Sequence, residues 1–379
     1  MSTTMFEQGN SEQQSAFLQR YWQREVCFFP ADKNTAFKLP LSANELAGLA
    51  MEEDVQSRIV TFDGDTWHLQ HGPFCEQDFR QEKPWTLLVQ KVDQLIPDLD
   101  YLWDQLDFIP RWRRDDIMVS YASKGGGVGP HFDRYDVFLL QGAGKRTWHI
   151  GQRCDETTAL KTGSDLCLLE NFELTQSFSC TAGDVLYIPP GVAHWGTADD
   201  DDCMTFSLGF RAPRQSDLLS RLCDQALENL PPTALLSDHN RKRSDYRGEI
   251  TQANVDNALA QLMVILKAQA CSLKWFGEVI TDTDVDWIMD ETEAEQLLAS
   301  SPHLYLNPEA QVAWQRQEPN GLLVFCNGHC VESIPEAAML LETLLSSQEL
   351  SAQHIKRSAE TAKTKAVLVA LLCSGAVIE

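Results

Sequence analysis

The sequence predicts an α+β protein built around an antiparallel double-sheet jelly roll, a double-stranded β-helix. Between residues 115 and 213, strand-like runs follow one another without a helical pattern between them, and Gly, Pro and Asp turns separate them. After residue 213 apolar residues recur at helical spacing instead. Because 379 residues suffice for two or three domains, we expect a jelly roll with N-terminal helical decoration at 1–213, a helical segment at 214–283 and a third domain at 284–379.

The residues before the jelly roll are expected to decorate it. Residues 15–29 (SAFLQRYWQREVCFF) have the pattern of a helix that passes into a strand. A second helix is expected to begin at Ser42, because Ser42 and Glu45 fit a capping box in which each side chain satisfies a backbone amide. Residues 58–71 are a hairpin candidate around an Asp-Gly turn. Residues 85–107 are expected to be mostly helical, with a break at a proline.

The strand that leads into the jelly roll has two distinct faces. Asp116, Met118 and Ser120 share one face, and the apolar Ile117 and Val119 alternate with them on the other. Further strands of the jelly roll are expected at residues 137–141, 145–151, 177–180, 184–189 and 203–210.

Three residues offer a set of metal ligands. His131 and Asp133 stand two residues apart, and in an extended strand this spacing turns both side chains to the same face. His194 follows a run of strand formers and a Pro-Pro-Gly turn. Two histidines and one carboxylate are the ligand set of non-haem Fe(II) oxygenases, which leaves open positions on the metal. We therefore expect His131, Asp133 and His194 to be the metal ligands and the catalytic centre.

These motifs carry a family resemblance. The stretch KGGGVGPHFDRYDVFLLQGAGKRTW at residues 124–148, followed by DVLYIPPGVAHWG at residues 184–196, resembles the catalytic core of the Jumonji-C type Fe(II)/2-oxoglutarate oxygenases. It is most similar to the ribosomal oxygenase branch, whose bacterial members hydroxylate an arginine of a large-subunit ribosomal protein. The resemblance implies Fe(II), 2-oxoglutarate as cosubstrate and dioxygen. The glycine run at residues 125–129 lacks the Lys and Ser/Thr of a phosphate loop, so we interpret it as backbone clearance beside the metal.

Arg146 is the predicted partner of the distal carboxylate of 2-oxoglutarate. In KRTWHIG it shares a face with Trp148 and Ile150, which suggests the barrel interior, and a guanidinium can hold a carboxylate through two hydrogen bonds. The resembled branch also carries its 2-oxoglutarate cation fifteen residues beyond the first ligand. An arginine paired with a surface acid is the alternative interpretation. Ser120, on the strand that leads into the site, is assigned to the same cosubstrate site.

Three residues are predicted on the substrate side. An arginine substrate needs an acidic or hydrogen-bonding partner near the metal, and the likeness to the arginine hydroxylases supports Asp116, Tyr135 and Ser207 in this role. Asp115, Arg134 or Asp136 could exchange roles with them, and a purely structural role remains open for each.

The composition limits the class of partner and compartment. The net charge of −24 argues against nonspecific binding to nucleic acid, and it fits either a basic partner or solubility alone. Eleven cysteines lack framework spacing, the N-terminus lacks the regions of a secretion signal, and no apolar run reaches the ~20 residues of a membrane span. We expect a cytoplasmic protein with reduced thiols and no membrane contact.

The remainder of the chain is expected to be helical and then mixed. Apolar stripes at residues 219–230 and 259–266 predict two helices whose stripes belong to a core. The resemblance implies that residues 214–280 form a homodimer interface. In the tail, the Asn327-Gly328 pair predicts a hairpin and residues 333–336 a helix cap, which together suggest a winged helix.

Two further sequence features of the tail bear on function. Cys326, His329 and Cys330 lie close together, but no second ligand pair accompanies them, so we do not expect zinc. Winged helices often bind nucleic acid, so a non-catalytic cupin with a nucleic-acid-binding tail is the rival hypothesis.

The resemblance implies hydroxylation of the β-carbon of an arginine in large-subunit ribosomal protein sixteen. Three alternatives remain at this point: hydroxylation of a histidine in another ribosomal protein, a metal-dependent cupin isomerase or dioxygenase that uses no 2-oxoglutarate, and the non-catalytic nucleic-acid-binding protein. The excess of 55 acidic over 31 basic residues suits a basic ribosomal substrate but does not select its reacting residue.

Overall fold

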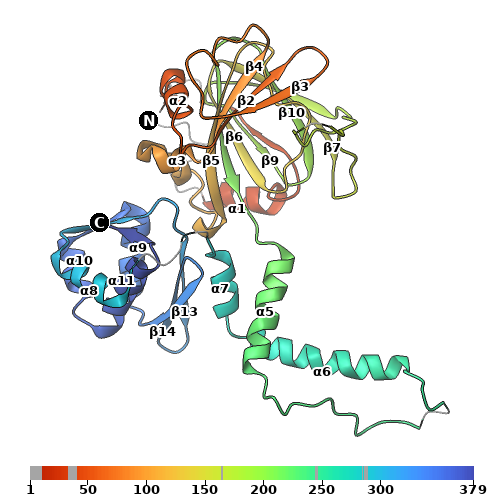
Figure 1. Ribbon diagram of the computed structural model, residues 1–379, viewed down its shortest axis with the longest axis vertical. Helices are drawn as coiled ribbons and strands as arrows, with labels where there is room; N and C mark the ends of the chain where they lie inside the picture. Colours follow the sequence, from red (N-terminus) through yellow and green to blue (C-terminus); the bar gives the residue numbers. More distant parts are fainter. Residues whose placement is uncertain (1–10, 33–40, 164, 244–245, 284, 286–288) are drawn as a thin grey trace. The chain divides into compact units, whose positions relative to one another are not determined.

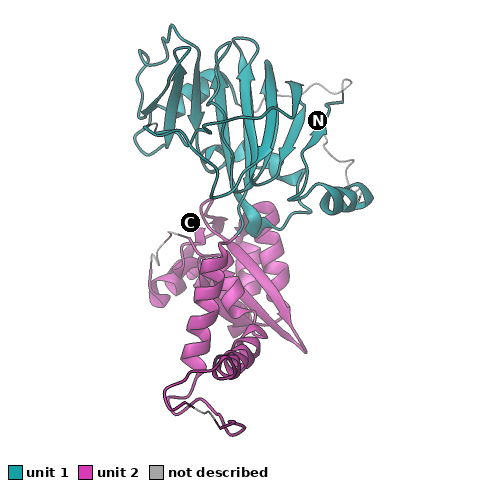
Figure 2. Ribbon diagram, turned by 90° about the vertical axis from the view of Figure 1, so that its right-hand side faces the viewer, with its two compact units in different colours: residues 1–212 teal, residues 213–379 magenta. Residues whose placement is uncertain are grey.

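The computed structural model describes residues 11–32, 41–163, 165–243, 246–283, 285 and 289–379 (Figure 1). The chain divides into two compact units, residues 1–212 and 213–379, which Figure 2 distinguishes by colour. The three-domain division expected from the sequence, with a boundary at residue 283, stays a prediction.

The first unit contains eleven strands in its described residues. Their bounds are β1 Cys27–Phe29, β2 Ser57–Phe62, β3 Trp67–His71, β4 Trp85–Val89, β5 Arg114–Ala122, β6 Asp136–Ala143, β7 Lys145–Arg153, β8 Gln176–Thr181, β9 Val185–Ile188, β10 Val192–Ala198 and β11 Cys203–Phe210. An eight-stranded sheet has the order β1-β9-β6-β11-β5-β4-β2-β3, and a three-stranded sheet has the order β10-β7-β8. All the pairs are antiparallel, as a jelly roll requires.

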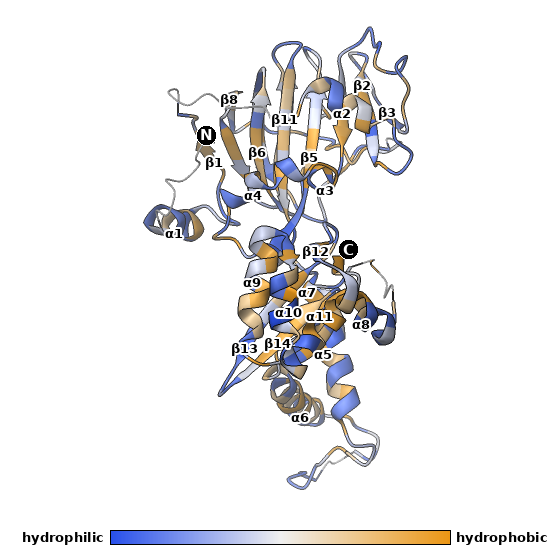
Figure 3. Cartoon of the chain, turned by 90° about the vertical axis from the view of Figure 1, so that its left-hand side faces the viewer, coloured by the Kyte–Doolittle hydropathy of each residue, from blue (hydrophilic) through white to orange (hydrophobic). Residues whose placement is uncertain are grey.

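The two sheets enclose one apolar layer. Val137 and Leu139 of β6 pack with Trp148 and Ile150 of β7, so these residues define the inner face of each sheet. The opposite, outer face of the eight-stranded sheet contributes to a second core, which the N-terminal helices cover. Hydrophobic colouring runs along much of β5, β6 and β11, in agreement with burial on both faces (Figure 3).

Short helices cover the outer face of the larger sheet. Their bounds are α1 Ser11–Arg20, α2 Ala43–Leu49, α3 Val92–Leu95 and α4 Tyr101–Asp104, with single 3₁₀ turns at Pro97–Leu99 and Arg111–Arg113. The predicted capping box of α2 is confirmed, because Ser42 Oγ accepts from Glu45 N and the Glu45 carboxylate accepts from Ser42 N. The predicted hairpin at residues 58–71 is confirmed as β2 and β3.

The prediction of a mostly helical segment at residues 85–107 is wrong in its first part. Trp85–Val89 is β4, which pairs with both β2 and β5 inside the larger sheet. A strand buried on both faces forms a continuous apolar run, and its periodicity does not distinguish it from a buried helix. Strand β10 was also absent from the expected strands, because Gly196 and His194 interrupt its run of strand formers.

The second unit contains the remaining elements. Their bounds are α5 Gln215–Asn229, α6 Gln252–Ala270, α7 Lys274–Ile280, α8 Glu291–Ser300, β12 His303–Leu306, β13 Val312–Gln317, β14 Gly321–Cys326, β15 His329–Ser333, α9 Ala337–Ser347, β16 Glu349–Ser351, α10 Ala352–Ser358, α11 Ala362–Cys373 and β17 Val377–Ile378. The predicted hairpin is confirmed: β14 and β15 pair around Asn327 and Gly328, whose φ angles are 44° and 80°. Both central residues therefore have the positive φ of a type I′ turn.

Two details of the second unit correct the sequence analysis. The cap predicted at residues 333–336 does not form, because Ser333 Oγ donates to Lys363 O while α9 begins after Glu336 without a side-chain cap. The helices α5 and α6 are confirmed, but only the stripe of α6 lies outside a core: Leu259, Leu262 and Met263 are half exposed in the single chain, whereas Ala226 of the α5 stripe is buried. The winged-helix assignment stays a prediction. Among the described helices, none combines the length and apolarity that a membrane span requires.

Candidate metal centre

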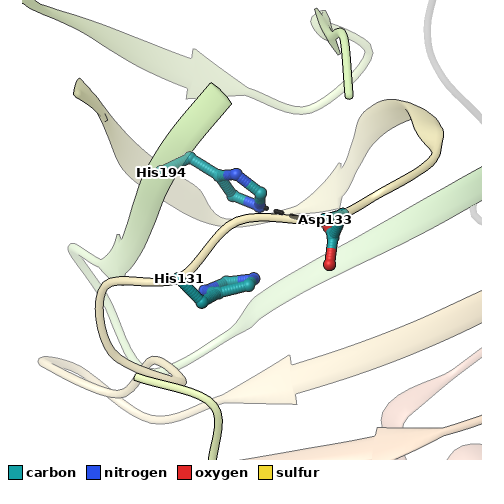
Figure 4. Close-up of side chains that lie close together, drawn as sticks. All are labelled: His131, Asp133 and His194. Carbon is teal, nitrogen blue, oxygen red and sulfur yellow. Dashed lines mark ion pairs between the residues drawn. The ribbon is translucent and has the colours of Figure 1, made fainter. Parts of the chain in front are cut away.

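His131, Asp133 and His194 form a cluster of potential ligands. One ligand atom from each lies within 4.8 Å of the others, and among the described residues no other group of three His, Cys, Asp or Glu side chains has this geometry. The three side chains point toward one another (Figure 4). His194 Nε2 is 3.5 Å from Asp133 Oδ2, and the two imidazole rings are 4.3 Å apart between centroids. Two imidazoles and a carboxylate at this spacing fit Fe(II) in a facial site.

The backbone brings the two histidines together through one β-bridge. His131 N donates to His194 O at 3.0 Å, and His194 N donates to His131 O at 2.8 Å. The segment around His131 is therefore extended only at this bridge, and Asp133 lies beyond it in a loop. The expectation that His131 and Asp133 share a regular strand is wrong, although both side chains reach the same site.

A hydrogen bond to the backbone sets the orientation of each imidazole. Nδ1 of His131 is 2.9 Å from Gly129 O, and Nδ1 of His194 is 3.0 Å from Val192 O. Since a carbonyl can only accept, each Nδ1 carries the proton and each Nε2 keeps a lone pair. Both rings therefore present Nε2 as the ligand atom, with the supporting bond that metal-binding histidines usually have.

His194 is buried as a neutral base. Its exposed fraction is 2%, and burial, reinforced by the neighbouring His131, lowers its pKa to about 4. Asp133 acts in the opposite direction but does not offset the desolvation. A neutral imidazole is the form that binds a metal cation, so this environment prepares His194 for ligation near neutral pH.

Gly127 and Gly129, in the glycine run before His131, lie where a side chain does not fit. A Cβ on Gly127 would be 2.3 Å from Gly196 O of β10, and Gly129 adopts a φ of +81°. Gly125 N also donates to Ala198 O at 2.8 Å, which fastens the run to β10. These contacts support the interpretation of residues 125–129 as backbone clearance beside the metal ligands.

Arg146 lies inside the barrel, as its pattern predicts. Arg146, Trp148 and Ile150 are all buried on the inner face of β7, and Arg146 is only 4% exposed. Its Nε contacts Cys203 Sγ at 3.3 Å, but its Nη2 is enclosed and makes no hydrogen bond among the described residues. The ion pairs of the described residues do not include Arg146, so the alternative of a pairing with a surface acid does not apply. A buried guanidinium with a free donor fits the carboxylate of a bound ligand.

Trp148 lies between Arg146 and the metal ligands. Its ring is 5.5 Å from the Arg146 guanidinium carbon and 6.0 Å from the His194 ring. Trp148 Nε1 is also enclosed without a hydrogen-bond partner in the described structure. Register pairs His194 with Ile150 and Ala198 with Arg146, about 13 Å apart along β7 at roughly 3.3 Å per residue. The side chain of Arg146 and a bound 2-oxoglutarate, a five-carbon diacid, together span the distance from Arg146 to His194.

Ser120 belongs to a polar row on the inner face of the larger sheet. Register places Ser120 opposite Thr205, and Thr205 opposite Gln141. Thr205 Oγ1 donates to Gln141 Oε1 at 3.0 Å, and Gln141 Nε2 lies 3.4 Å from Cys203 Sγ, the atom that Arg146 also contacts. Thr205, Gln141 and Cys203 are not predicted from the sequence, because only cross-strand register shows that they lie beside Ser120.

Asp116 and Ser207, two of the predicted substrate residues, lie along the same inner face. Register pairs Ser207 of β11 with Met118 of β5, two residues from Asp116. Burial raises the pKa of Asp116 to about 6, with Asp115 and Asp93 acting in the same direction. Tyr135 follows the metal-ligand loop and is 37% exposed, which places it at the surface of the site.

The alternative residues differ in environment from the predicted ones. Asp136 is fully buried, and it accepts from Arg113, Gln23 and Tyr187, so its carboxylate is saturated in a structural network. Asp115 and Arg134 are exposed. Of Asp115, Asp116 and Asp136, only Asp116 is partly buried and on the inner face of the larger sheet.

Comparisons with known proteins agree with this geometry. The JmjC domain family matches residues 101–218. The "Ribosomal protein uL16 3-hydroxylase" of Escherichia coli K12 is 32% identical over 370 residues, which cover 95% of each chain. The "Probable ribosomal oxygenase" of Haemophilus influenzae is 42% identical over 208 residues, 54% of this chain and 50% of that protein.

A solved structure is similar over nearly the whole chain. YcfD, described as a ribosomal oxygenase from Escherichia coli in complex with cobalt and 2-oxoglutarate, has a TM-score of 0.76 and 31% identity. The match covers 96% of this chain and 97% of YcfD. Cobalt in that complex stands in for Fe(II). The 2-oxoglutarate of that complex is a dicarboxylate, which is the kind of ligand that the buried guanidinium of Arg146 suits.

Proposed function

The chain belongs to the ribosomal oxygenase family of JmjC-domain proteins, and from this premise we propose that it hydroxylates the β-carbon of an arginine in ribosomal protein uL16. The position follows the name of the relative, a uL16 3-hydroxylase, since carbon 3 of an amino acid is its β-carbon. The name of the relative supports the substrate protein. The observation in the structure that carries the oxygenase chemistry is the buried, unpaired Nη2 of Arg146 inside the barrel that also holds the three candidate metal ligands.

The residues of the site divide into a metal group and a cosubstrate group. His131, Asp133 and His194 hold Fe(II) and leave the remaining positions for cosubstrate and dioxygen. Arg146 and Ser120 hold the distal carboxylate of 2-oxoglutarate. Iron with 2-oxoglutarate and dioxygen supplies an oxidant strong enough to hydroxylate an unactivated carbon. The role of the chain is to place the target carbon beside this centre and to exclude other groups.

The substrate side suits a cationic side chain. Asp116 presents a carboxylate on the inner face, Ser207 adds a hydroxyl on the neighbouring strand, and Tyr135 offers an aromatic wall at the surface. An ionised Asp116 accepts a charge-assisted hydrogen bond from a guanidinium, whereas a neutral imidazole gains less from it. This contrast favours arginine over the histidine alternative.

The charge of the chain supports a basic protein substrate. The net charge of −24 attracts a basic ribosomal protein and repels nucleic acid, so we do not assign nucleic-acid binding to the tail. All eleven cysteines are free thiols, which agrees with a reducing cytoplasm where ribosomal proteins are made.

Residues 214–280 are the proposed homodimer interface. Helix α6 buries none of its residues in the single chain, although Leu259, Leu262 and Met263 form an apolar stripe on it. A stripe of this kind on a 19-residue helix is stabilised when a second copy covers it.

Intact-mass analysis of ribosomal proteins from cells with and without the gene tests the proposal. We expect an added oxygen atom on uL16 alone, mapped to an arginine by fragmentation, which disappears in the deletion strain and in one that carries His131→Ala. An oxygen on histidine of another ribosomal protein would move the enzyme to the histidyl branch of the family. If no ribosomal protein changes mass, the proposed function is wrong.

A further inference from the structure

Arg58 and Gln90 lie beside the proposed arginine site, although neither is part of the predicted site. Arg58 is on β2 and Gln90 directly follows β4. Register pairs Arg58 with Leu88 of β4, and Leu88 with Ser120 of β5. Arg58 therefore extends from the inner face of the larger sheet, the face that carries Asp116.

The Gln90 amide separates the guanidinium of Arg58 from the carboxylate of Asp116. With its nitrogen toward Asp116, that nitrogen is 2.9 Å from Oδ2, and its oxygen accepts from Arg58 Nη2 at 3.2 Å. The reverse orientation would set the amide oxygen against the carboxylate and the amide nitrogen against the guanidinium. Only the first orientation satisfies both neighbours, so Gln90 bridges a cation and an anion that do not touch directly.

The two oxygens of Asp116 have different surroundings. Oδ2 accepts from the backbone N of Lys91 at 2.9 Å and from the Gln90 amide. Oδ1 has no hydrogen bond among the described residues, and it faces Gly209 of β11, where a Cβ would approach it to 3.7 Å. One oxygen is thus held by the segment after β4, and the other has no hydrogen-bond partner among the described residues and lies near Gly209 of β11.

Arg58 retains free donors next to this carboxylate. Its Nε is enclosed without a hydrogen-bond partner in the described structure, and its other contact is Met118 Sδ at 3.9 Å from Nη2. An arginine with unused donors pairs with a carboxylate that comes within reach. If Arg58 paired with Asp116, the carboxylate would lose most of its attraction for a cationic substrate.

We propose that Gln90 is a positioning residue that anchors Asp116 through Oδ2 and keeps Arg58 from pairing with it, which leaves Oδ1 for the substrate guanidinium. The inference rests on the proposed arginine hydroxylation and deepens it, because it names what keeps the acidic partner available. Gln90 touches neither metal nor cosubstrate in this assignment, so its effect is confined to binding of the protein substrate.

The test compares Gln90→Leu with Gln70→Leu. Gln70 carries the same side chain on β3, opposite Ile59, so it lies on the outer face of the sheet and is exposed. With recombinant uL16 as substrate, we expect Gln90→Leu to raise the KM for uL16 about 50-fold, because an anchor is lost and a competing cation is gained. We expect kcat and the KM for 2-oxoglutarate to stay within about twofold, and Gln70→Leu to match wild type in all three.

A second substitution distinguishes positioning from general damage to the fold. Adding Arg58→Met to Gln90→Leu removes the competing cation, so the KM for uL16 should fall back to about fivefold above wild type. A damaged sheet would not recover when a second inner-face residue is replaced.

Each outcome supports or overturns the inference. If Gln90→Leu has the same KM as Gln70→Leu, Gln90 does not position Asp116. If the double variant is no better than Gln90→Leu, Arg58 is not the group that Gln90 holds off. Both results would leave arginine hydroxylation by the wild-type enzyme intact, whereas a wild type that does not hydroxylate arginine in uL16 would overturn this inference and the proposed function together.

Discussion

Replacement of Arg146 by methionine should separate cosubstrate binding from folding. The Nη2 of Arg146 is enclosed and unpaired, so at least one charge-assisted hydrogen bond forms when the distal carboxylate of 2-oxoglutarate arrives. Such a bond contributes about 1.5–3 kcal/mol, and each 1.4 kcal/mol is about tenfold in affinity. We therefore expect Arg146→Met to raise the KM for 2-oxoglutarate about 10-fold to 100-fold.

The same substitution should not destabilise the protein without ligands. Arg146 is 4% exposed and has no carboxylate partner among the described residues, so its burial is unfavourable until cosubstrate binds. Methionine fills similar space without a charge. The melting temperature of the metal-free variant should equal or exceed that of wild type, and Fe(II) should still bind.

The assay measures succinate formation against 2-oxoglutarate concentration, together with thermal unfolding of the metal-free protein. Arg153→Met is the matched control, because Arg153 is on the same strand β7 but exposed. Its KM for 2-oxoglutarate should equal that of wild type. An unchanged KM in Arg146→Met would show that another cation binds the cosubstrate. A lower melting temperature would show that Arg146 is paired within the protein.

Four further predictions concern the metal, the substrate acid and the dimer. His131→Ala should abolish both stoichiometric Fe(II) binding, measured by metal analysis, and succinate formation, because one of three ligands is lost. Burial raises the pKa of Asp116 to about 6, so the carboxylate becomes charged as pH rises through 6. Because the charged form binds the substrate guanidinium, the KM for uL16 should fall between pH 5.5 and 7, and Asp116→Asn should remove this dependence. The raised pKa also means that Asp116 opposes folding as pH rises from 3.8 to about 6, so Asp116→Asn should be the more stable protein at pH 8 in chemical denaturation. Leu262→Asp on α6 should convert a dimer to a monomer in light scattering, and a wild type that is already monomeric would contradict the proposed interface.

The candidate metal ligands could be recognised in the sequence because their pattern is local. His131 and Asp133 are two residues apart, and the Pro-Pro-Gly turn before His194 marks where the chain re-enters the barrel. The inward direction of Arg146 followed in the same way from the alternation in β7. The error at residues 85–107 arose where alternation fails, since β4 is mostly apolar, is buried on both faces and lies between two other strands.

The residues that surround the ligands could not be predicted, because cross-strand register decides them. Gln141, Thr205 and Ser120 form one row only because β6, β11 and β5 pair in a single register, and a shift of one residue would turn each to the outer face. The positions of Arg58 and Gln90 depend in addition on β4, whose sequence predicts a helix. Because β4 was misassigned, the sequence could not place Arg58 and Gln90 beside Asp116. The candidate metal ligands do not depend on β4 and could still be recognised. The row beside Ser120 therefore depends on long-range strand pairing, whereas the candidate metal site depends on short motifs that one backbone bridge brings together.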